Sequence, residues 1–301
     1  MSGPRGEGGV AGDVAGGTGS EADPAAAGAL RERLAGWRER PREEVREAVE
    51  ALLDALEAGS VRAAVPDPAS ASGWRAEGWV KDGILAAFAL GEDVELDLEP
   101  LAFRDRHTLL PRRPAPPGTR VVPGGTAVRR GAHLARGVVV MPPAYVNVGA
   151  FVGEGSMVDS HALVGSCAQI GARVHLSAAA QVGGVLEPVG ALPVIVEDEV
   201  FVGGNVGLYE GVVVGRRSVL AAGVVLTSST ALYDLPGERV LRAAPGEPLV
   251  VPAGSVVVMG SRPAGGDFAR AEGLALATPV IVKRRDEKTD AKTALEDVLR
   301  R

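Results

Sequence analysis

Aliphatic residues recur every six positions from Val122 to Leu226, and no other feature of the sequence constrains the fold as strongly. A six-residue period matches neither an α-helix, with about 3.6 residues per turn, nor a lone amphipathic strand, with a period of two. The residue four places after each aliphatic is usually small, as at Ala132 and Ala150. After Val182 the frame slips by two and then resumes at Val196. The aliphatic positions are Val122, Val128, Leu134, Val140, Val146, Val152, Val158, Val164, Ile170, Leu176, Val182, Val196, Val202, Leu208, Val214, Leu220 and Leu226.

This period is typical of a parallel β-helix built from hexapeptide repeats. Each hexad forms a short strand and a corner, with the aliphatic pointing into the coil and the small residue filling the tight inner corner. Stacked coils pair their strands edge to edge, about 4.8 Å apart. Because each coil buries its interior only against its neighbours, several coils are needed for stability. Three hexads per coil predict between five and six coils.

The composition outside the repeat predicts four segments. Residues 1–27 are rich in Gly, Ala, Ser, Glu and Asp and are expected to be a disordered extension, since they cannot bury enough apolar surface to fold. Residues 28–118 are predicted to form a helical domain and linker, with one helix ending near Gly59 and another over Trp79–Leu90. Residues 119–232 form the β-helix. Residues 233–301 are predicted to hold a loop over 234–247, strands at 254–259 and 278–283, and a short terminal helix that together cap the coil.

Charge and cysteine content limit the partners and the compartment. A formal net charge of −6 argues against nucleic acid or an anionic membrane surface as a partner. The single cysteine, Cys167, excludes an internal disulfide and fits a reducing compartment, so we expect a cytoplasmic protein. No stretch of the repeat is apolar over a length that could cross a bilayer, and no secretory signal is visible.

Several phrases within this frame are specific. The run MVDSHALVGSCAQIG at 157–171 follows VVMPPAYVNVGAFVGEG and precedes VHLSAAAQVGGVLEP, and TRVVPG opens the repeat at 119–124. VPAGSVVVMG and PVIVK follow near the end of the chain. Together these phrases resemble the bacterial tetrahydrodipicolinate N-succinyltransferases of the hexapeptide-repeat acyltransferases. The resemblance covers the chain from about Val45 onward.

The resemblance implies a left-handed parallel β-helix that forms a homotrimer, with each active site in a groove between neighbouring subunits. It implies transfer of succinyl from succinyl-CoA to the amine of L-2-amino-6-oxopimelate, the hydrated form of tetrahydrodipicolinate, in lysine and diaminopimelate biosynthesis. Asp159 in MVDS matches the aspartate that contacts substrate and takes part in catalysis, and Arg120 in TRVVPG matches the arginine that binds the dicarboxylate. Ser166 in SCAQIG is a further candidate for substrate contact.

Elementary chemistry agrees with both main assignments. Asp159 follows the inward Val158, so its side chain should point out of the coil, where a carboxylate could take the proton that an ammonium must lose before it attacks a thioester. The alternative is that Asp159 only makes hydrogen bonds in a turn. Arg120 offers the permanently charged fork that a dicarboxylate requires. Its alternative is a solvated arginine near a linker.

One position departs from the family. The common catalytic glutamate aligns with Gly207, so a second carboxylate is missing there, and Glu210 and Glu187 are the candidates to replace it. His161, where the family more often has tryptophan, is either a general base or a residue that packs or lines the substrate groove. Water or a substrate carboxylate could also take the proton.

The remaining histidines, the cysteine and the late basic residues complete the predictions. His133, His161 and His175 have gaps that fit no coil-to-coil pattern, so we expect no metal site. Cys167 is expected to be a packed thiol and His175 a structural or groove-lining residue. Lys283 and Arg284, with Arg285, either meet the phosphates of CoA or form a solvated tail.

Two other functions stay open at this point. One is an acyltransferase that uses acetyl-CoA or acts on an amino dicarboxylate of secondary metabolism. The other is a trimeric scaffold whose catalytic pair has decayed, although the presence of both Arg120 and Asp159 argues against decay.

Overall fold

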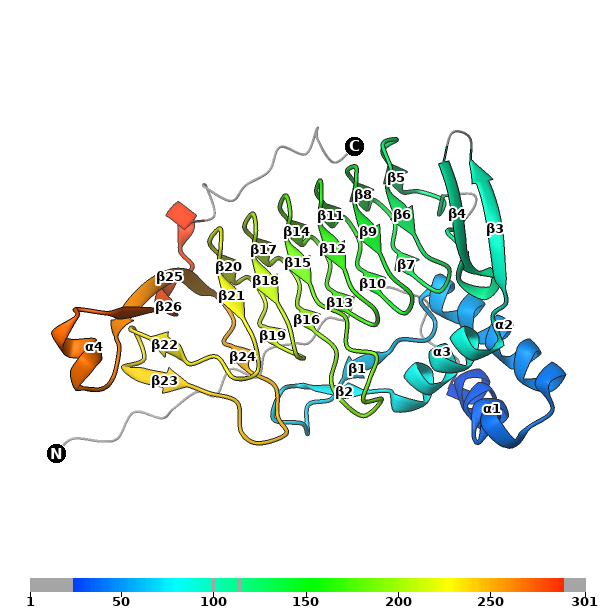
Figure 1. The fold of residues 1–301 in the computed structure, drawn as a ribbon, viewed down its shortest axis with the longest axis horizontal. Helices are drawn as coiled ribbons and strands as arrows, with labels where there is room; N and C mark the ends of the chain where they lie inside the picture. The colour runs from blue at the N-terminus through cyan, green and yellow to red at the C-terminus, as the bar shows by residue number, and fades with distance from the viewer. Residues whose placement is uncertain (1–23, 99–100, 113–114, 290–301) are drawn as a thin grey trace, which may run out of the picture.

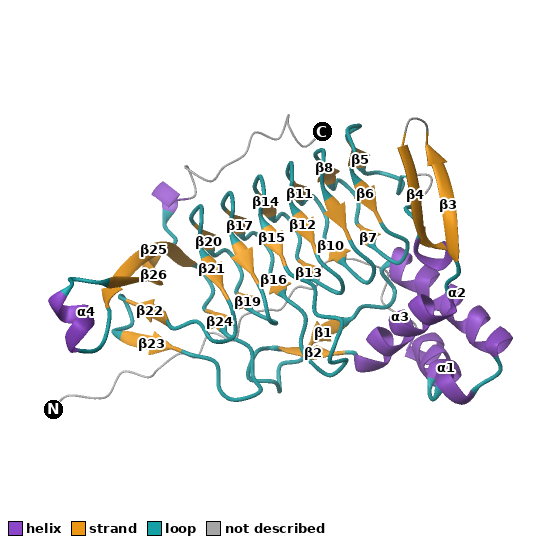
Figure 2. Ribbon diagram, viewed as in Figure 1, coloured by secondary structure: helices purple, strands orange, loops and turns teal. Residues whose placement is uncertain are grey.

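The protein, described by a computed structural model over residues 24–98, 101–112 and 115–289, is elongated. A group of helices lies near one end, a coil of parallel strands fills the middle, and a long β-hairpin extends from the other end (Figure 1). Figure 2 shows that nearly all helical structure lies before the coil. The three parts follow the order predicted from the sequence.

Three helices form the N-terminal group: α1 (Pro24–Leu34), α2 (Arg42–Ala58) and α3 (Gly78–Leu90). The two predicted helices are confirmed, and Gly59, with φ 75°, ends α2 in the left-handed conformation that glycine adopts without strain. Helix α1 was not predicted. It begins inside the segment assigned to the extension because its alanine-rich sequence favours a helix although only Leu34 is buried. Residues 1–23 of that extension lie outside the described residues.

Two short antiparallel pairs were not predicted: one lies between α2 and α3 in the chain, and the other lies between α3 and the coil. Strand β1 (Ala64–Pro66) pairs with β2 (Trp74–Ala76), and β3 (Asp93–Leu98) pairs with β4 (Leu101–Arg106). Strands β1 and β2 are three residues each, too short for a visible period, whereas Asp93–Leu98 (DVELDL) does alternate and could have been predicted as a strand. Two single turns of 3₁₀ helix, Trp37–Glu39 and His107–Leu109, complete this region.

The coil consists of three parallel sheets whose strands are two residues long, except for the long last strand of the first sheet. Each sheet takes one strand from each successive coil. The first sheet holds β5 (Arg120–Val121), β8 (Val139–Val140), β11 (Met157–Val158), β14 (His175–Leu176), β17 (Phe201–Val202), β20 (Val219–Leu220) and β25 (Ser255–Pro263). The second sheet holds β6 (Ala127–Val128), β9 (Tyr145–Val146), β12 (Leu163–Val164), β15 (Gln181–Val182), β18 (Gly207–Leu208) and β21 (Val225–Leu226). The third sheet holds β7 (His133–Leu134), β10 (Phe151–Val152), β13 (Gln169–Ile170), β16 (Ile195–Val196), β19 (Val213–Val214) and β24 (Val250–Val251).

The predicted aliphatic positions form the core of this coil. From Val128 to Leu226 each one is the second residue of its strand and is buried in one continuous apolar cluster. The first position is a correction. Val121, not Val122, points inward, because β5 pairs Val121 with Val140 and an extra residue fits in the turn that contains Gly124 and Gly125.

Corners between sheets explain several sequence choices. The fourth residue of a hexad turns the corner with positive φ, and this residue is glycine at Gly149 and Gly223 but a larger residue at His161 and Cys167. We call the corner between the first and second sheets the first corner, the next one the second corner, and the return to the first sheet the third corner.

The helical group packs on the second corner of the early coils. A Cβ added at Gly149 would lie 2.8 Å from Ile84 Cδ1 and 2.9 Å from Cys167 Sγ, so only glycine permits this approach. Cys167 is fully buried, and burial raises the pKa of its thiol to about 12, which confirms the predicted packed thiol. His175 stacks on Phe201 with ring centroids 5.1 Å apart, consistent with a structural role.

Two insertions interrupt the coil after β15 and β21. The first, which we call the excursion, is residues 183–194. The second contains β22 (Leu232–Asp234) and β23 (Arg239–Leu241), so the predicted loop over 234–247 is partly a hairpin. The predicted late strands are confirmed as β25 and β26 (Ala275–Arg284), which form an antiparallel hairpin with the short helix α4 (Asp267–Ala271) at its tip. The predicted terminal helix over 294–299 lies outside the described residues.

Candidate active site

Arg120 and Asp159 project from the same sheet. Arg120 pairs with Val139, which pairs with Met157, so Arg120 and Met157 are two strands apart in the first sheet. This separation is about 10 Å of stacking. Asp159 lies two residues after Met157, and side chains alternate along a strand, so both polar side chains point out of the coil. The register therefore aligns the two predicted substrate residues on one outer surface.

The carboxylate of Asp159 is half-buried at the first corner. Its Oδ1 accepts a hydrogen bond from the backbone N–H of Ser160 at 2.7 Å, the local turn contact expected of an aspartate at a corner. Within the described residues, Oδ2 has no hydrogen-bond partner from the chain. One oxygen thus orients the side chain, and the other is available to a ligand.

His161 follows at the same corner with a φ of 62°. Its side chain is exposed, and its ring makes no hydrogen bond to any residue that the structure describes. Its carbonyl oxygen accepts from Gln181 Nε2 at 3.2 Å. The structure therefore brings His161 close to Asp159 along the chain without linking their side chains.

A groove of about 790 Å³ lies at the second corner, between the excursion and the segment before β24. It holds both candidates for the missing carboxylate, Glu187 and Glu210. Glu210 Oε2 accepts hydrogen bonds from the N–H and Oγ of Ser228, at 3.1 and 2.5 Å. The described residues that line the groove are Gly183, Gly184, Val185, Glu187, Pro188, Ala191, Leu192, Tyr209, Glu210, Gly211, Ser228, Ser229, Ala243, Ala244, Pro245, Gly246, Glu247 and Pro248.

A side chain at Gly207 would meet the ring of Tyr209. A Cβ at this position would lie 2.6 Å from Cε2 of Tyr209 and 3.1 Å from its hydroxyl oxygen. The ring of Tyr209 also lies over Gly183, where a Cβ would be 2.7 Å from Cδ1. The missing carboxylate is visible in the sequence, but the role of Tyr209 is not, because only the fold places its ring over both glycines.

Ser166 belongs to the second corner but does not line the groove. Its carbonyl oxygen accepts from the N–H of Val185 at 3.2 Å and so fixes the start of the excursion. The other end of the excursion is held by Lys81, a fully buried residue of α3 whose Nζ donates to the carbonyl oxygen of Ala191. Burial lowers the pKa of Lys81. The helical group therefore shapes one wall of the groove.

The late basic residues have partners inside the chain. Lys283 Nζ lies 2.9 Å from both carboxylate oxygens of Asp286, and Arg284 bonds to Asp234 and to Ser255 Oγ. Contact of Lys283 and Arg284 with CoA phosphates stays a prediction, and it now requires that these internal contacts be shared or broken.

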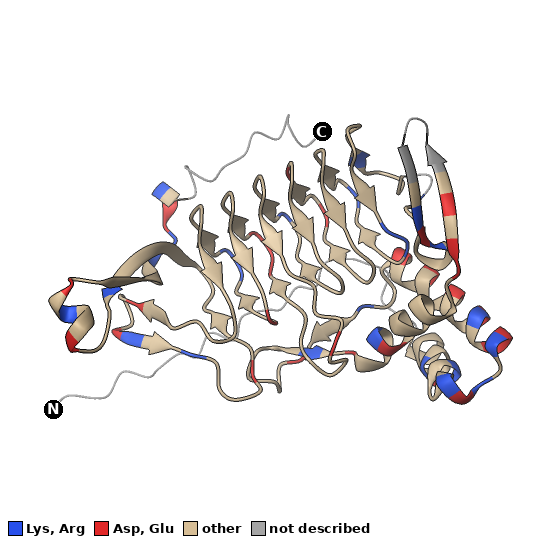
Figure 3. Ribbon diagram, in the orientation of Figure 1, with Lys and Arg blue, Asp and Glu red and all other residues tan. Residues whose placement is uncertain are grey.

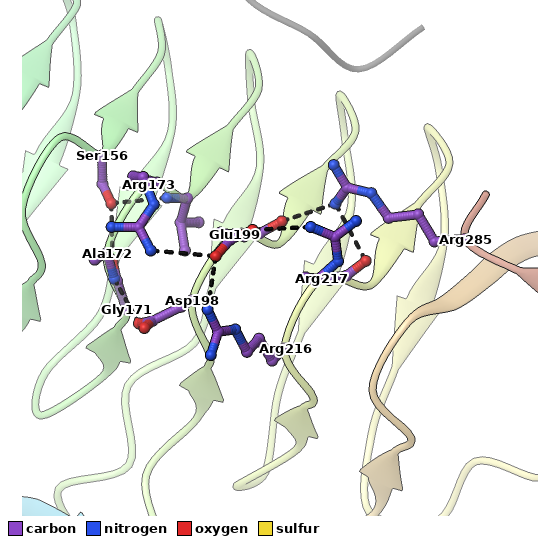
Figure 4. A network of polar contacts seen from close by, with 10 residues as sticks. Ser156, Gly171, Ala172, Arg173, Asp198, Glu199, Arg216, Arg217 and Arg285 are labelled. Carbon is purple, nitrogen blue, oxygen red and sulfur yellow. Dashed lines mark hydrogen bonds and ion pairs between the residues drawn. The ribbon is translucent and has the colours of Figure 1, made fainter. Parts of the chain in front are cut away.

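A network of arginines around Glu199 occupies the third corner (Figure 4). The Glu199 carboxylate accepts from Arg173, Arg216 and Arg217 at 3.2, 2.8 and 3.1 Å. The hydrogen bond from Arg216, together with that from Arg173, lowers the pKa of Glu199 to about 2. Arg285 donates to the carbonyl oxygens of Glu199 and Arg217, which ties the end of the hairpin to the coil. This network is not visible in the sequence because its members come from separate coils.

One chain does not bring all the candidates together. Arg120, Asp159 and His161 belong to the first sheet and first corner, whereas Glu187 and Glu210 lie in the groove at the second corner. Figure 3 shows few charged residues along the strands themselves, compared with the helical group. Among the described residues there is no group of three side chains that could hold a metal ion, and no helix there is long and apolar enough to cross a membrane.

Two protein-family models match this sequence. The model described as the N-terminal region of tetrahydrodipicolinate N-succinyltransferase matches residues 30–90. The model described as the hexapeptide repeat of succinyl-transferase matches residues 193–228. The matches confirm the predicted fold class, a left-handed parallel β-helix of hexapeptide repeats with a small N-terminal helical domain and a C-terminal capping region.

Relatives of known name match most of the chain. The sequence is 45% identical over 263 residues to a 2,3,4,5-tetrahydropyridine-2,6-dicarboxylate N-succinyltransferase from Bordetella avium, covering 85% of this chain and 90% of the relative. It is 43% identical over 283 residues to the protein of that name from Gluconobacter oxydans, covering 90% and 96%. A solved structure from Campylobacter jejuni, described as a 2,3,4,5-tetrahydropyridine-2-carboxylate N-succinyltransferase, has a TM-score of 0.46 and 19% identity, covering 78% of this chain and 62% of that one.

Proposed function

The chain belongs to the family of tetrahydrodipicolinate N-succinyltransferases, and from that premise we propose that it transfers succinyl from succinyl-CoA to the amine of L-2-amino-6-oxopimelate. This acceptor is the hydrated, ring-opened form of tetrahydrodipicolinate, in lysine and diaminopimelate biosynthesis. The observation that carries the proposal is the match to named relatives over 85–90% of the chain at 43–45% identity. The single buried cysteine supports a cytoplasmic location.

In this proposal Arg120 binds a carboxylate of the acceptor and Asp159 acts on its amine. The guanidinium is a planar, permanently charged donor that suits a carboxylate. The ammonium first gives one proton to water. As the free amine nitrogen bonds to the thioester carbonyl carbon, Asp159 Oδ2 accepts the second proton that this nitrogen loses, the carbon–sulfur bond breaks, and the proton passes to the thiolate to give the CoA thiol. The outward direction of both side chains from one sheet supports these roles.

The complete site is proposed to form between copies of the chain. The first corner carries Asp159, and the second corner carries the groove with Glu210, so the two cannot meet within one subunit. A homotrimer that packs the first corner of one subunit against the second corner of its neighbour would unite them. Molar mass in solution, measured by light scattering, tests this arrangement, and a monomer at assay concentration would contradict it.

The central experiment measures thiol release from acyl-CoA with 2-aminopimelate as acceptor. We expect turnover with succinyl-CoA and a much smaller rate with acetyl-CoA. The variant Asp159→Asn keeps the shape of the side chain but cannot accept the proton, so we expect kcat to fall about 10²-fold to 10⁴-fold.

The matched control is Asp267→Asn, whose side chain is almost fully exposed in α4 and pairs only with Arg270 among the described residues. We expect it to match the wild type. Unchanged kinetics for Asp159→Asn would remove this residue from the mechanism. Preference for acetyl-CoA would support the acetyl-transferring alternative, and no turnover with either donor would support the scaffold.

A further inference from the structure

The Tyr209 side chain lies in the groove on a seat made by two glycines. Gly207 belongs to β18, and Gly183 occupies the equivalent position to Tyr209 one coil earlier, since Gln181 pairs with Gly207. A Cβ at either glycine would lie within 2.7 Å of a ring carbon of Tyr209. The two glycines therefore let the ring lie close against the outer surface of the second sheet, and a larger residue at either position would displace it.

The hydroxyl of Tyr209 is available in this seat. The residue is 37% exposed, and among the described residues the chain offers no hydrogen-bond partner to its oxygen. Its backbone is fixed, because its N–H donates to the carbonyl oxygen of Leu226 and its own carbonyl oxygen accepts from Val212. Because the ring is already held in place, the Tyr209 side chain loses little conformational entropy when its hydroxyl binds a ligand.

The charges around this hydroxyl restrict the ligand. Three carboxylates, from Glu187, Glu210 and Glu247, line the groove, and its described lining contains no lysine or arginine. A phosphate group of a ligand would be repelled here. An uncharged carbonyl oxygen can accept the phenolic hydrogen without that penalty. In an acyl-CoA the thioester and the amides of the pantetheine arm are such groups.

We propose that Tyr209 is a positioning residue that donates a hydrogen bond to a thioester or amide carbonyl of the acyl donor, and that Gly183 and Gly207 are glycines because they seat its ring. The inference rests on the proposed function, since it takes an acyl-CoA as the ligand. It also explains why no carboxylate stands at position 207: the phenol occupies the space that such a side chain would need.

The test compares Tyr209→Phe with Tyr233→Phe, a tyrosine of β22 that lies outside the groove lining. Tyr209→Phe keeps the ring on its seat and removes only the hydroxyl. We expect its dissociation constant for succinyl-CoA, measured by calorimetry, to rise about fivefold with no change in the melting temperature. Tyr233→Phe should bind like the wild type. An unchanged dissociation constant for Tyr209→Phe overturns the proposal.

A second variant tests the seat itself. In Gly207→Ala the added methyl would meet the ring at 2.6 Å, so the ring must leave and binding should weaken at least as much as in Tyr209→Phe. Wild-type binding by Gly207→Ala would show that the seat is unnecessary. Calorimetry needs no turnover, so failure of the succinyl-transfer assay rejects the proposed function, whereas equal binding by wild type and Tyr209→Phe rejects this inference alone. Absence of acyl-CoA binding by the wild type rejects both. A Tyr209→Phe effect on the KM of the amine acceptor alone would also overturn the assignment to the acyl donor.

Discussion

Arg284 holds Asp234 with two contacts at the base of the C-terminal hairpin: its Nη2 lies 3.0 Å from Oδ1 and 2.8 Å from Oδ2. The Asp234 side chain is fully buried, and Arg239 Nε donates to it at 3.2 Å. This carboxylate therefore joins β22, β23 and β26, which lie at the end of the coil.

Removal of this carboxylate should destabilise the protein. In Asp234→Asn two guanidinium groups lose their anionic partner, and we expect the free energy of unfolding to fall by about 2 kcal/mol, below the range for fully buried pairs because Arg284 is 39% exposed. Urea denaturation measures this change. Asp267→Asn is the control, and a loss under 0.5 kcal/mol would show that the pair is dispensable.

The arginine network around Glu199 should make stability depend on acid pH. The pKa of Glu199 is about 2 in the folded chain against 4.5 for the free group, so its contribution is fully present above about pH 4.5 and is lost as the pH falls toward 2. We expect the free energy of unfolding of Glu199→Gln, measured by urea denaturation, to be about 1 kcal/mol below that of the wild type near neutral pH. This difference should shrink between pH 4.5 and 3. Glu272→Gln serves as the exposed control. A difference that stays constant down to pH 3 would contradict the assignment.

Two corner glycines at the same hexad position should respond differently to alanine. Both have positive φ, 74° at Gly149 and 77° at Gly223, so each variant pays about 1–2 kcal/mol for the left-handed backbone. Gly223 has nothing within 4 Å of the added carbon, whereas Gly149 would contact Ile84 and Cys167. We expect a further loss of about 1–3 kcal/mol in Gly149→Ala. Equal melting temperatures for the two variants would mean that Ile84 and Cys167 move away from the added methyl group at no measurable cost.

His161 also adopts this corner conformation, and glycine should relieve its strain. We expect His161→Gly to stabilise the fold by about 0.5 kcal/mol and to keep most of kcat, because Asp159 is the proposed proton acceptor. The same assay should include Glu210→Gln. A fall in kcat for His161→Gly as large as that for Asp159→Asn would transfer the role of base to the histidine.

The thiol of Cys167 should not react in the folded protein. It is fully buried, and burial raises its pKa to about 12, so almost no thiolate forms at pH 8. We expect a disulfide reagent to label one thiol only after unfolding in guanidinium chloride. Rapid labelling of the native protein would show that the helical group detaches from the second corner.

The six-residue period by itself determined the coil, because every hexad repeats one local requirement: a branched aliphatic inside and a tight corner after it. The helix periods of α2 and α3 and the late strands β25 and β26 could be predicted for the same local reason. The sequence motifs around Asp159 and Arg120 pointed to the reaction through their resemblance to a known family. The outward direction of both side chains followed from alternation along a strand.

Only the tertiary structure decided which side chains meet. Tyr209 covers Gly207 and Gly183, and Glu199 gathers arginines from neighbouring coils, through contacts between residues that a local pattern cannot pair. The inward-pointing residue of the first strand is Val121 and not Val122, because the following turn holds an extra residue that the six-residue period does not reveal. Corner identity separated Asp159 from Glu210, because which side of a three-sided coil a residue occupies depends on every insertion before it, and not on its own hexad.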